Sequence, residues 1–210
     1  MTDSSRWHSQ IHRSVTAAIG IAAVAIFAGT PIVAMAHSFI VALDATAADP
    51  PEQLTSAIQG MRLAAGERDS HAAETSDGHL GGIDLFIRVV PAKSAEGITW
   101  LRGAPNGAAT IVVDFSNSES GPSHMMHGDS VVIGPGVLPA GSVWSADAIA
   151  VAEGFVARYH AAYGTAPDRQ AAQGYNVALR IDRAIRDQGG VQDSRGLQQS
   201  LDLSAGGIDW

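Results

Sequence analysis

The sequence predicts an α/β domain, a three-layer fold in which a mostly parallel sheet is flanked by helices. Three observations predict it. Short apolar runs typical of strands alternate with longer segments whose apolar residues recur at helical spacing. One run, residues 109–115, is apolar almost throughout rather than alternating, which is typical of a strand covered on both faces. A helical tail then follows the last predicted strand.

The first part of this domain is predicted to form a strand, a helix and a second strand. Residues 39–43 are an apolar run, and from Glu52 the apolar residues fall at i, i+3 and i+4 intervals on one helical face. A polar stretch over residues 67–79 interrupts the helical pattern. A Gly-Gly pair then precedes a strand over residues 83–90. Alternation places four apolar side chains of this strand on one face: Ile83, Leu85, Ile87 and Val89.

The second part is predicted to add two strands before the helical tail. A weak helical pattern over residues 94–101 leads to the apolar strand at 109–115, and a short strand follows at 130–133. Ser145 suits the N-cap of the next helix, which Gly164 ends. The predicted core stripe of that helix is Ala148, Ala152, Phe155 and Tyr159.

Two further helices are predicted to complete the tail. Pro167-Asp168 opens the first and Gly189-Gly190 ends it, while either residue of the pair Asp193-Ser194 caps the second. Tyr159 and Tyr163, spaced i, i+4, are predicted to pack between helices rather than to stack on a ligand. The residues predicted to face inward are Tyr175, Ala178, Leu179, Ile181, Ile185, Leu197 and Leu201.

Residues 1–36 have the features of a signal peptide. Two arginines precede an uncharged stretch over residues 14–33, and Ala34-Met35-Ala36 then supplies the small-x-small pattern of a cleavage site. Cleavage would make His37 the first residue of a mature domain, 37–210, in the periplasm. The alternative is an uncleaved anchor, because about twenty such residues can span a bilayer. Either interpretation places the domain outside the cytoplasm.

Composition and motifs exclude several classes of function. Thirteen Lys and Arg residues against 21 Asp and Glu give a formal charge of −8, which argues against nucleic acid or an anionic membrane as the main partner. Contact with a membrane is expected only through an uncleaved signal segment. The absence of cysteine excludes disulfides, thiolate metal sites and cysteine nucleophiles. The chain has no nucleophile elbow, HExxH or P-loop motif, so we expect neither an enzyme nor a cofactor.

The C-terminal part resembles a known family of transport proteins. Residues 153–168, EGFVARYHAAYGTAPD, resemble the FxxxYxxxYGxxPD segment of type I periplasmic solute-binding proteins, the branched-chain amino acid receptors of ABC importers. The similarity continues through AAQGYN at 171–176 and the Gly-Gly pair at 189–190. Nearer the other end, residues 59–64 resemble the helix after the family's first strand, and 81–83 resemble the GG that opens its second.

This resemblance implies a single periplasmic-binding-protein-like lobe that binds a small polar, amino-acid-like solute for an ABC permease. The chain departs from the family in having about half its usual length, without the second lobe. Asn176 also stands where aspartate is typical. Because one lobe does not close over a ligand, a homodimer that rebuilds the cleft is an alternative. A receptor remnant that serves as a sensor or interaction module is another.

The polar loop after the strand at 109–115 is the predicted ligand site, because ligands of open α/β sheets bind beyond the carboxyl ends of strands. In a zwitterionic ligand, the carboxylate would accept hydrogen bonds from hydroxyls and the ammonium would donate to an aspartate. An ordinary solvated turn is the alternative interpretation of this composition. The predicted ligand-binding residues are Asp114, Ser116, Ser118 and Ser120.

A copper-binding or accessory protein is the alternative function. His124 and His127 flank two methionines, and thioether and imidazole groups both bind copper. Cleavage after Ala36 would let His37 add a free amine and an imidazole, and His71 and His79 are further potential donors. The competing interpretation is that His124 and His127 lie on an exposed turn.

Overall fold

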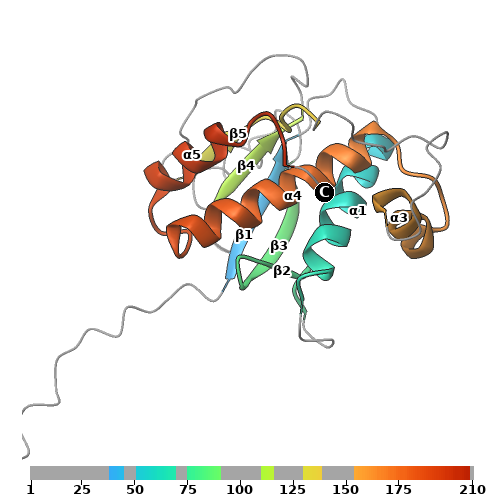
Figure 1. Cartoon of the computed structure of the whole chain (residues 1–210), viewed down its shortest axis with the longest axis horizontal. Helices are drawn as coiled ribbons and strands as arrows, with labels where there is room; N and C mark the ends of the chain where they lie inside the picture. Colours follow the sequence, from blue (N-terminus) through green and yellow to red (C-terminus); the bar gives the residue numbers. More distant parts are fainter. Residues whose placement is uncertain are drawn as a thin grey trace, which may run out of the picture. The chain divides into compact units, whose positions relative to one another are not determined.

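The fold is α/β, as predicted, with a mixed five-stranded sheet and four helices in the described part of the chain (Figure 1). All described residues belong to the second of two units into which the chain divides, Met35–Trp210. The first described residue is Ser38, so the predicted signal peptide, 1–36, lies outside the described residues. The computed structural model describes residues 38–44, 51–69, 75–90, 110–115, 130–138 and 154–208.

The sheet has the strand order β2-β3-β1-β4-β5. The central strand β1 (Ser38–Asp44) pairs in parallel with β3 (Ile83–Val90) on one side and with β4 (Ile111–Asp114) on the other. β5 (Val131–Ile133) continues the parallel arrangement beyond β4. Only the two-residue strand β2 (His79–Leu80) is antiparallel to its neighbour. All four strands predicted from apolar runs are confirmed.

Sequence periodicity does not predict β2, and treating residues 67–79 as only a break in the pattern was wrong at His79. Strand β2 forms because Gly81 and Gly82 make a tight turn, with φ angles of +62° and +79°. Two consecutive left-handed residues form the turn that suits a two-residue hairpin. The hairpin places His79 opposite Asp84 in the sheet.

Four helices accompany the sheet. In Figure 1, α1 (Pro51–Gly66) and the long α4 (Arg169–Gln188) lie over the same face of it. The short α3 (Phe155–Tyr163) packs on α1, and α5 (Ser194–Leu203) packs on α4 and β5. None of the described helices is both long and apolar enough to span a membrane; residues 14–33 are outside this search.

The ends of α4 and α5 follow the predicted capping chemistry. The Asp168 carboxylate accepts a 2.7 Å hydrogen bond from the Ala171 N–H at the start of α4. Gly189 closes that helix with a left-handed φ of 69°. The Asp193 carboxylate caps α5 by accepting from two backbone N–H groups, which selects Asp193 over Ser194 as the cap. All seven residues predicted to face inward from these helices are buried.

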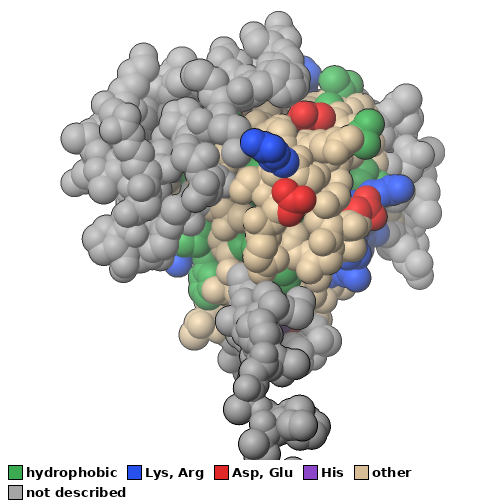
Figure 2. Space-filling model, turned by 90° about the vertical axis from the view of Figure 1, so that its left-hand side faces the viewer, with side chains coloured by type: hydrophobic (Ala, Val, Ile, Leu, Met, Phe, Trp, Pro, Cys, Tyr) green, Lys and Arg blue, Asp and Glu red, His purple; other side chains and the backbone are tan. Residues whose placement is uncertain are grey.

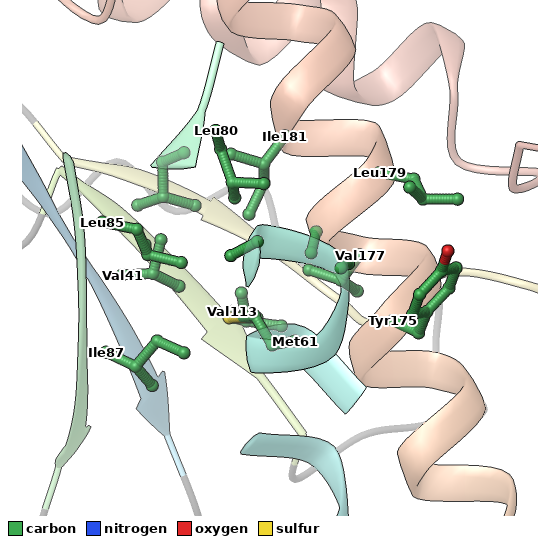
Figure 3. Close-up of a cluster of buried hydrophobic side chains, with 14 of the residues drawn as sticks. Val41, Met61, Leu80, Leu85, Ile87, Val113, Tyr175, Val177, Leu179 and Ile181 are labelled. Atoms are coloured by element: carbon green, nitrogen blue, oxygen red, sulfur yellow. The ribbon is translucent and has the colours of Figure 1, made fainter. Parts of the chain in front are cut away.

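The main hydrophobic core lies between the sheet and the helices α1 and α4. Figure 3 shows Val41, Leu85 and Val113 of three neighbouring strands together with Met61 of α1 and Ile181 of α4. All five side chains are fully buried. The odd-numbered strand residues face this core because successive side chains of a strand alternate between the two faces.

The opposite face of the sheet also buries apolar side chains. Ala42, Val112 and Val132 form a second small cluster, each at most 5% exposed. Ile111 and Val113 are buried in the main core, so β4 is buried on both faces. The inference drawn from the continuous apolar run at 109–115 is therefore confirmed.

Two details of the prediction were wrong. Val89 shares a face with Ile87 but is 47% exposed, near the carboxyl end of β3. The helix that contains Phe155 does not start at Ser145: its N-cap is Gly154, in an extended conformation. Glycine favours such a break because it is a poor helix former. The helix predicted at 94–101 lies outside the described residues.

The helices α1 and α4 approach each other at paired glycines. A Cβ atom added to Gly60 would collide with the carbonyl oxygen of Ala171. In the same way, a Cβ atom at Gly174 would collide with the carbonyl oxygen of Ala57. The two helices thus contact each other backbone to backbone, at a distance that only glycine permits at these two positions.

We therefore expect Gly60→Ala to destabilise the protein by about 1–3 kcal/mol or more, because the helices must separate or bend to admit the methyl group. Gly66→Ala is the matched control, since a Cβ atom at Gly66 has no neighbour within 4 Å. It should leave stability unchanged or raise it by a few tenths of a kcal/mol. Chemical denaturation measures both. Equal stability of the two variants would contradict the close crossing.

Candidate ligand site at the carboxyl edge of the sheet

The carboxyl ends of β1 and β4 lie side by side in the middle of the sheet. From β1 the chain continues through α1 toward β3 on one side, whereas from β4 it continues to β5 on the other. The direction of the connections therefore reverses between β1 and β4. Open α/β sheets leave a ligand-binding crevice at such a topological switch point.

Each of these two strands ends in an aspartate. Asp44 and Asp114 are partners in the parallel register, so their Cα atoms are about 4.8 Å apart, the spacing of neighbouring strands. Both carboxylates are partly buried. They share a face with Ala42 and Val112, which is the face opposite α1 and α4. A backbone hydrogen bond of 3.1 Å from the Phe115 N–H to Asp44 O joins the two strand ends just beyond the aspartate pair.

This pair can bind a cationic group. Carboxylates are acceptors with two oxygens each, and an ammonium group carries several N–H donors, so one ammonium can bridge both aspartates. A metal ion would need more ligands, and within the described ranges no group of three His, Asp or Glu side chains has positions suited to one.

Of the predicted ligand-binding and metal-binding residues, the structure describes Asp114 and His79. Asp114 lies at the carboxyl edge, as predicted. Asp44 was missed as a site residue, although the same signal was present: it directly follows an apolar run, as Asp114 does. The other candidates lie outside the described residues: His37, His71, Ser116, Ser118, Ser120, His124 and His127.

His79 has a structural position. Its Nδ1 lies 2.9 Å from Oδ1 of Asp69, and its Nε2 lies 2.6 Å from Oδ1 of Asp84. The residue is only 8% exposed. Both ring nitrogens thus contact carboxylates, and the imidazole joins the segment after α1 to the β2–β3 hairpin. This arrangement occupies the nitrogen atoms that metal binding would require.

The other end of the hairpin is held by a buried carboxylate of α4. Asp182 accepts a 2.7 Å hydrogen bond from the Gly81 N–H and two of 3.1 Å from Arg186. Arg68 adds an ion pair at 3.2 Å. Burial by itself raises the pKa of Asp182, but the hydrogen bonds from Arg186 and Gly81 and the two positive charges outweigh it and lower the pKa below its ordinary value.

The aromatic residues of α3 attach this helix to α1, as predicted for Tyr159 and Tyr163. Their ring centroids are 4.8 Å apart. The Tyr159 hydroxyl donates to the Gln59 side chain at 2.7 Å, and the Tyr163 hydroxyl donates to the Gln59 carbonyl at 2.9 Å. Burial raises the pKa of Tyr159 to about 12. The tyrosines are thus neutral donors in a helix interface.

The surface charge is dispersed on the side of the molecule in Figure 2, where described acidic and basic side chains lie close together.

No protein-family model, no curated protein and no solved structure matches the chain.

The Asp182 contacts predict a pH dependence of stability. Because its pKa is lower in the folded protein than in the unfolded chain, Asp182 stabilises the fold above the unfolded value of about 3.9. That contribution is lost as the pH falls from there through the folded pKa. Asp182→Asn should therefore lower stability at pH 7 and flatten the loss of stability below about pH 4. Urea denaturation at a series of pH values measures the free energy of unfolding of both proteins. If the variant loses stability below pH 4 as steeply as the unmodified protein does, the prediction is wrong.

Proposed function

We propose that the chain is an exported protein that reversibly binds a small polar, amino-acid-like solute. The observation that carries this proposal is the register pair of Asp44 and Asp114 at the switch point of the sheet. Two carboxylates on one face of the sheet suit the ammonium group of such a ligand. Ser116, Ser118 and Ser120, which follow Asp114 in the chain, would donate hydrogen bonds to its carboxylate.

The proposed architecture is a three-layer lobe of the periplasmic-binding-protein type. The strand order β3-β1-β4-β5 corresponds to the 2-1-3-4 order of doubly wound sheets, which supports this assignment. The burial of Ala42, Val112 and Val132 on the face opposite α1 and α4 also supports a second covering layer. No described residue favours the copper-binding alternative.

The proposed biological role is delivery of the solute to an ABC permease. Residues 1–36 would direct export, and residues 37–210 would act in the periplasm. A single lobe offers only one side of a cleft, so a second copy of the chain or the permease itself would complete it. Binding by the isolated lobe is accordingly expected to be weak.

Isothermal titration of the purified chain against amino acids, simple amines and small acids tests the proposal. We expect a primary amine to be necessary for binding, and Asp44→Asn or Asp114→Asn to weaken it about tenfold or more, the effect of losing one charge-assisted hydrogen bond. Both variants conserve side-chain volume.

Asp193→Asn is the control for these variants. It removes one negative charge at the start of α5, and asparagine caps a helix as well as aspartate does. The affinity of this variant for the primary amine should equal that of the unmodified protein. If no compound in the panel binds to monodisperse protein, or if all three variants behave alike, the proposed site is wrong.

A further inference from the structure

A groove of about 540 Å³ lies along α4 and α5, on the helical side of the sheet. It is separate from the aspartate pair, which lies on the opposite face. Two arginines of α4, Arg180 and Arg183, contribute to its lining together with Ser200 of α5 and Ser204, the C-cap of that helix. The groove thus combines two positive charges with hydroxyl groups.

Arg180 is a buried cation whose hydrogen-bond partners are all neutral. It is only 2% exposed, and its guanidinium donates to Leu201 O at 2.8 Å and, at 3.4 Å, to Gly134 O and Ser204 Oγ. Within the described part of the chain, no carboxylate forms an ion pair with it. Burial lowers the pKa of Arg180 to about 10, the negative charge of Asp202 acts in the opposite direction, and the group is still a cation at neutral pH. A buried charge is costly where its ion pairing is incomplete.

Two further side chains of the groove, Arg183 and Ser200, offer donors to an anion. The Arg183 side chain is 68% exposed, and its Nε lies 3.9 Å from Oδ2 of Asp187. An exposed ion pair of this kind contributes little to stability. Ser200 Oγ accepts a 2.9 Å hydrogen bond from Gln188, which leaves its own proton to donate. Arg183 and Ser200 thus offer N–H and O–H donors to an anion at this end of the groove.

We propose that this groove is a second binding site, for a small organic monocarboxylate. The carboxylate would lie between the guanidinium groups of Arg180 and Arg183, where planar N–H pairs match its two oxygens. The carbon chain would pack on Leu203 and Ile208, which are the apolar part of the lining. Asp187 at the rim disfavours a doubly charged phosphate, because like charges repel.

Titration of the 210-residue chain with acetate, butanoate, hexanoate and inorganic phosphate, followed by NMR or calorimetry, tests this inference. Butanoate and hexanoate should bind more tightly than acetate, because each buried CH₂ group adds favourable transfer free energy. Phosphate should not compete. Arg183→Gln should weaken butanoate binding about tenfold, since an exposed charge is removed without disturbing the core.

Arg169→Gln is the matched control, because Arg169 is exposed at the other end of α4, 14 residues and about 21 Å from Arg183. This variant should bind butanoate as the unmodified protein does. Absence of carboxylate binding, equal effects of the two arginine variants, or tighter binding of phosphate than of butanoate would each overturn the inference. If Asp44→Asn and Asp114→Asn abolish butanoate binding but Arg183→Gln does not, the carboxylate binds at the sheet edge and the groove is not a site.

Discussion

The close crossing of α1 and α4 is the constraint on which the rest of the domain depends. Gly60 and Gly174 bring the two backbones into contact, and the Met61 and Val177 side chains beside the crossing are buried in the core that covers β1, β3 and β4. A wider crossing would lift one helix from the sheet and open that core. Since interiors are close-packed, even one additional methyl group must move a whole helix.

Side chains of helix α4 form hydrogen bonds to the sheet region at two separate places. Near its carboxyl end, Asp182 holds the Gly81 N–H in the turn between β2 and β3. Half a turn earlier, Arg180 reaches the carbonyl of Gly134, which follows β5. One helix thus contacts the two outermost strand regions, and both contacts use a buried charge. The carboxylate forms ion pairs with arginines, whereas the hydrogen-bond partners of the guanidinium are neutral and Asp202 acts on it only electrostatically.

The two proposed sites lie on opposite faces of the sheet and differ in chemistry. Asp44 and Asp114 offer acceptors on one face, while Arg180 and Arg183 offer donors on the side of α4 and α5. Only part of this was predictable from sequence. Asp114 could be identified because it ends an apolar run, and the same argument applies to Asp44. Arg180 could not, because in the sequence it is one of several charged residues in an amphipathic helix, and only packing shows that it is buried.

The sequence by itself determined the type and order of the described elements other than β2, because periodicity and helix caps act between residues a few positions apart. It predicted the buried faces of α4 and α5, the double burial of β4 and the role of Asp193 or Ser194 as a cap. The tertiary structure decided which distant residues meet: Asp44 with Asp114, His79 with two carboxylates, and Gly60 with Ala171. Such pairs depend on strand register and on the angle and separation of packed helices. These quantities come from the balance of the whole core, and no short stretch of the chain contains them.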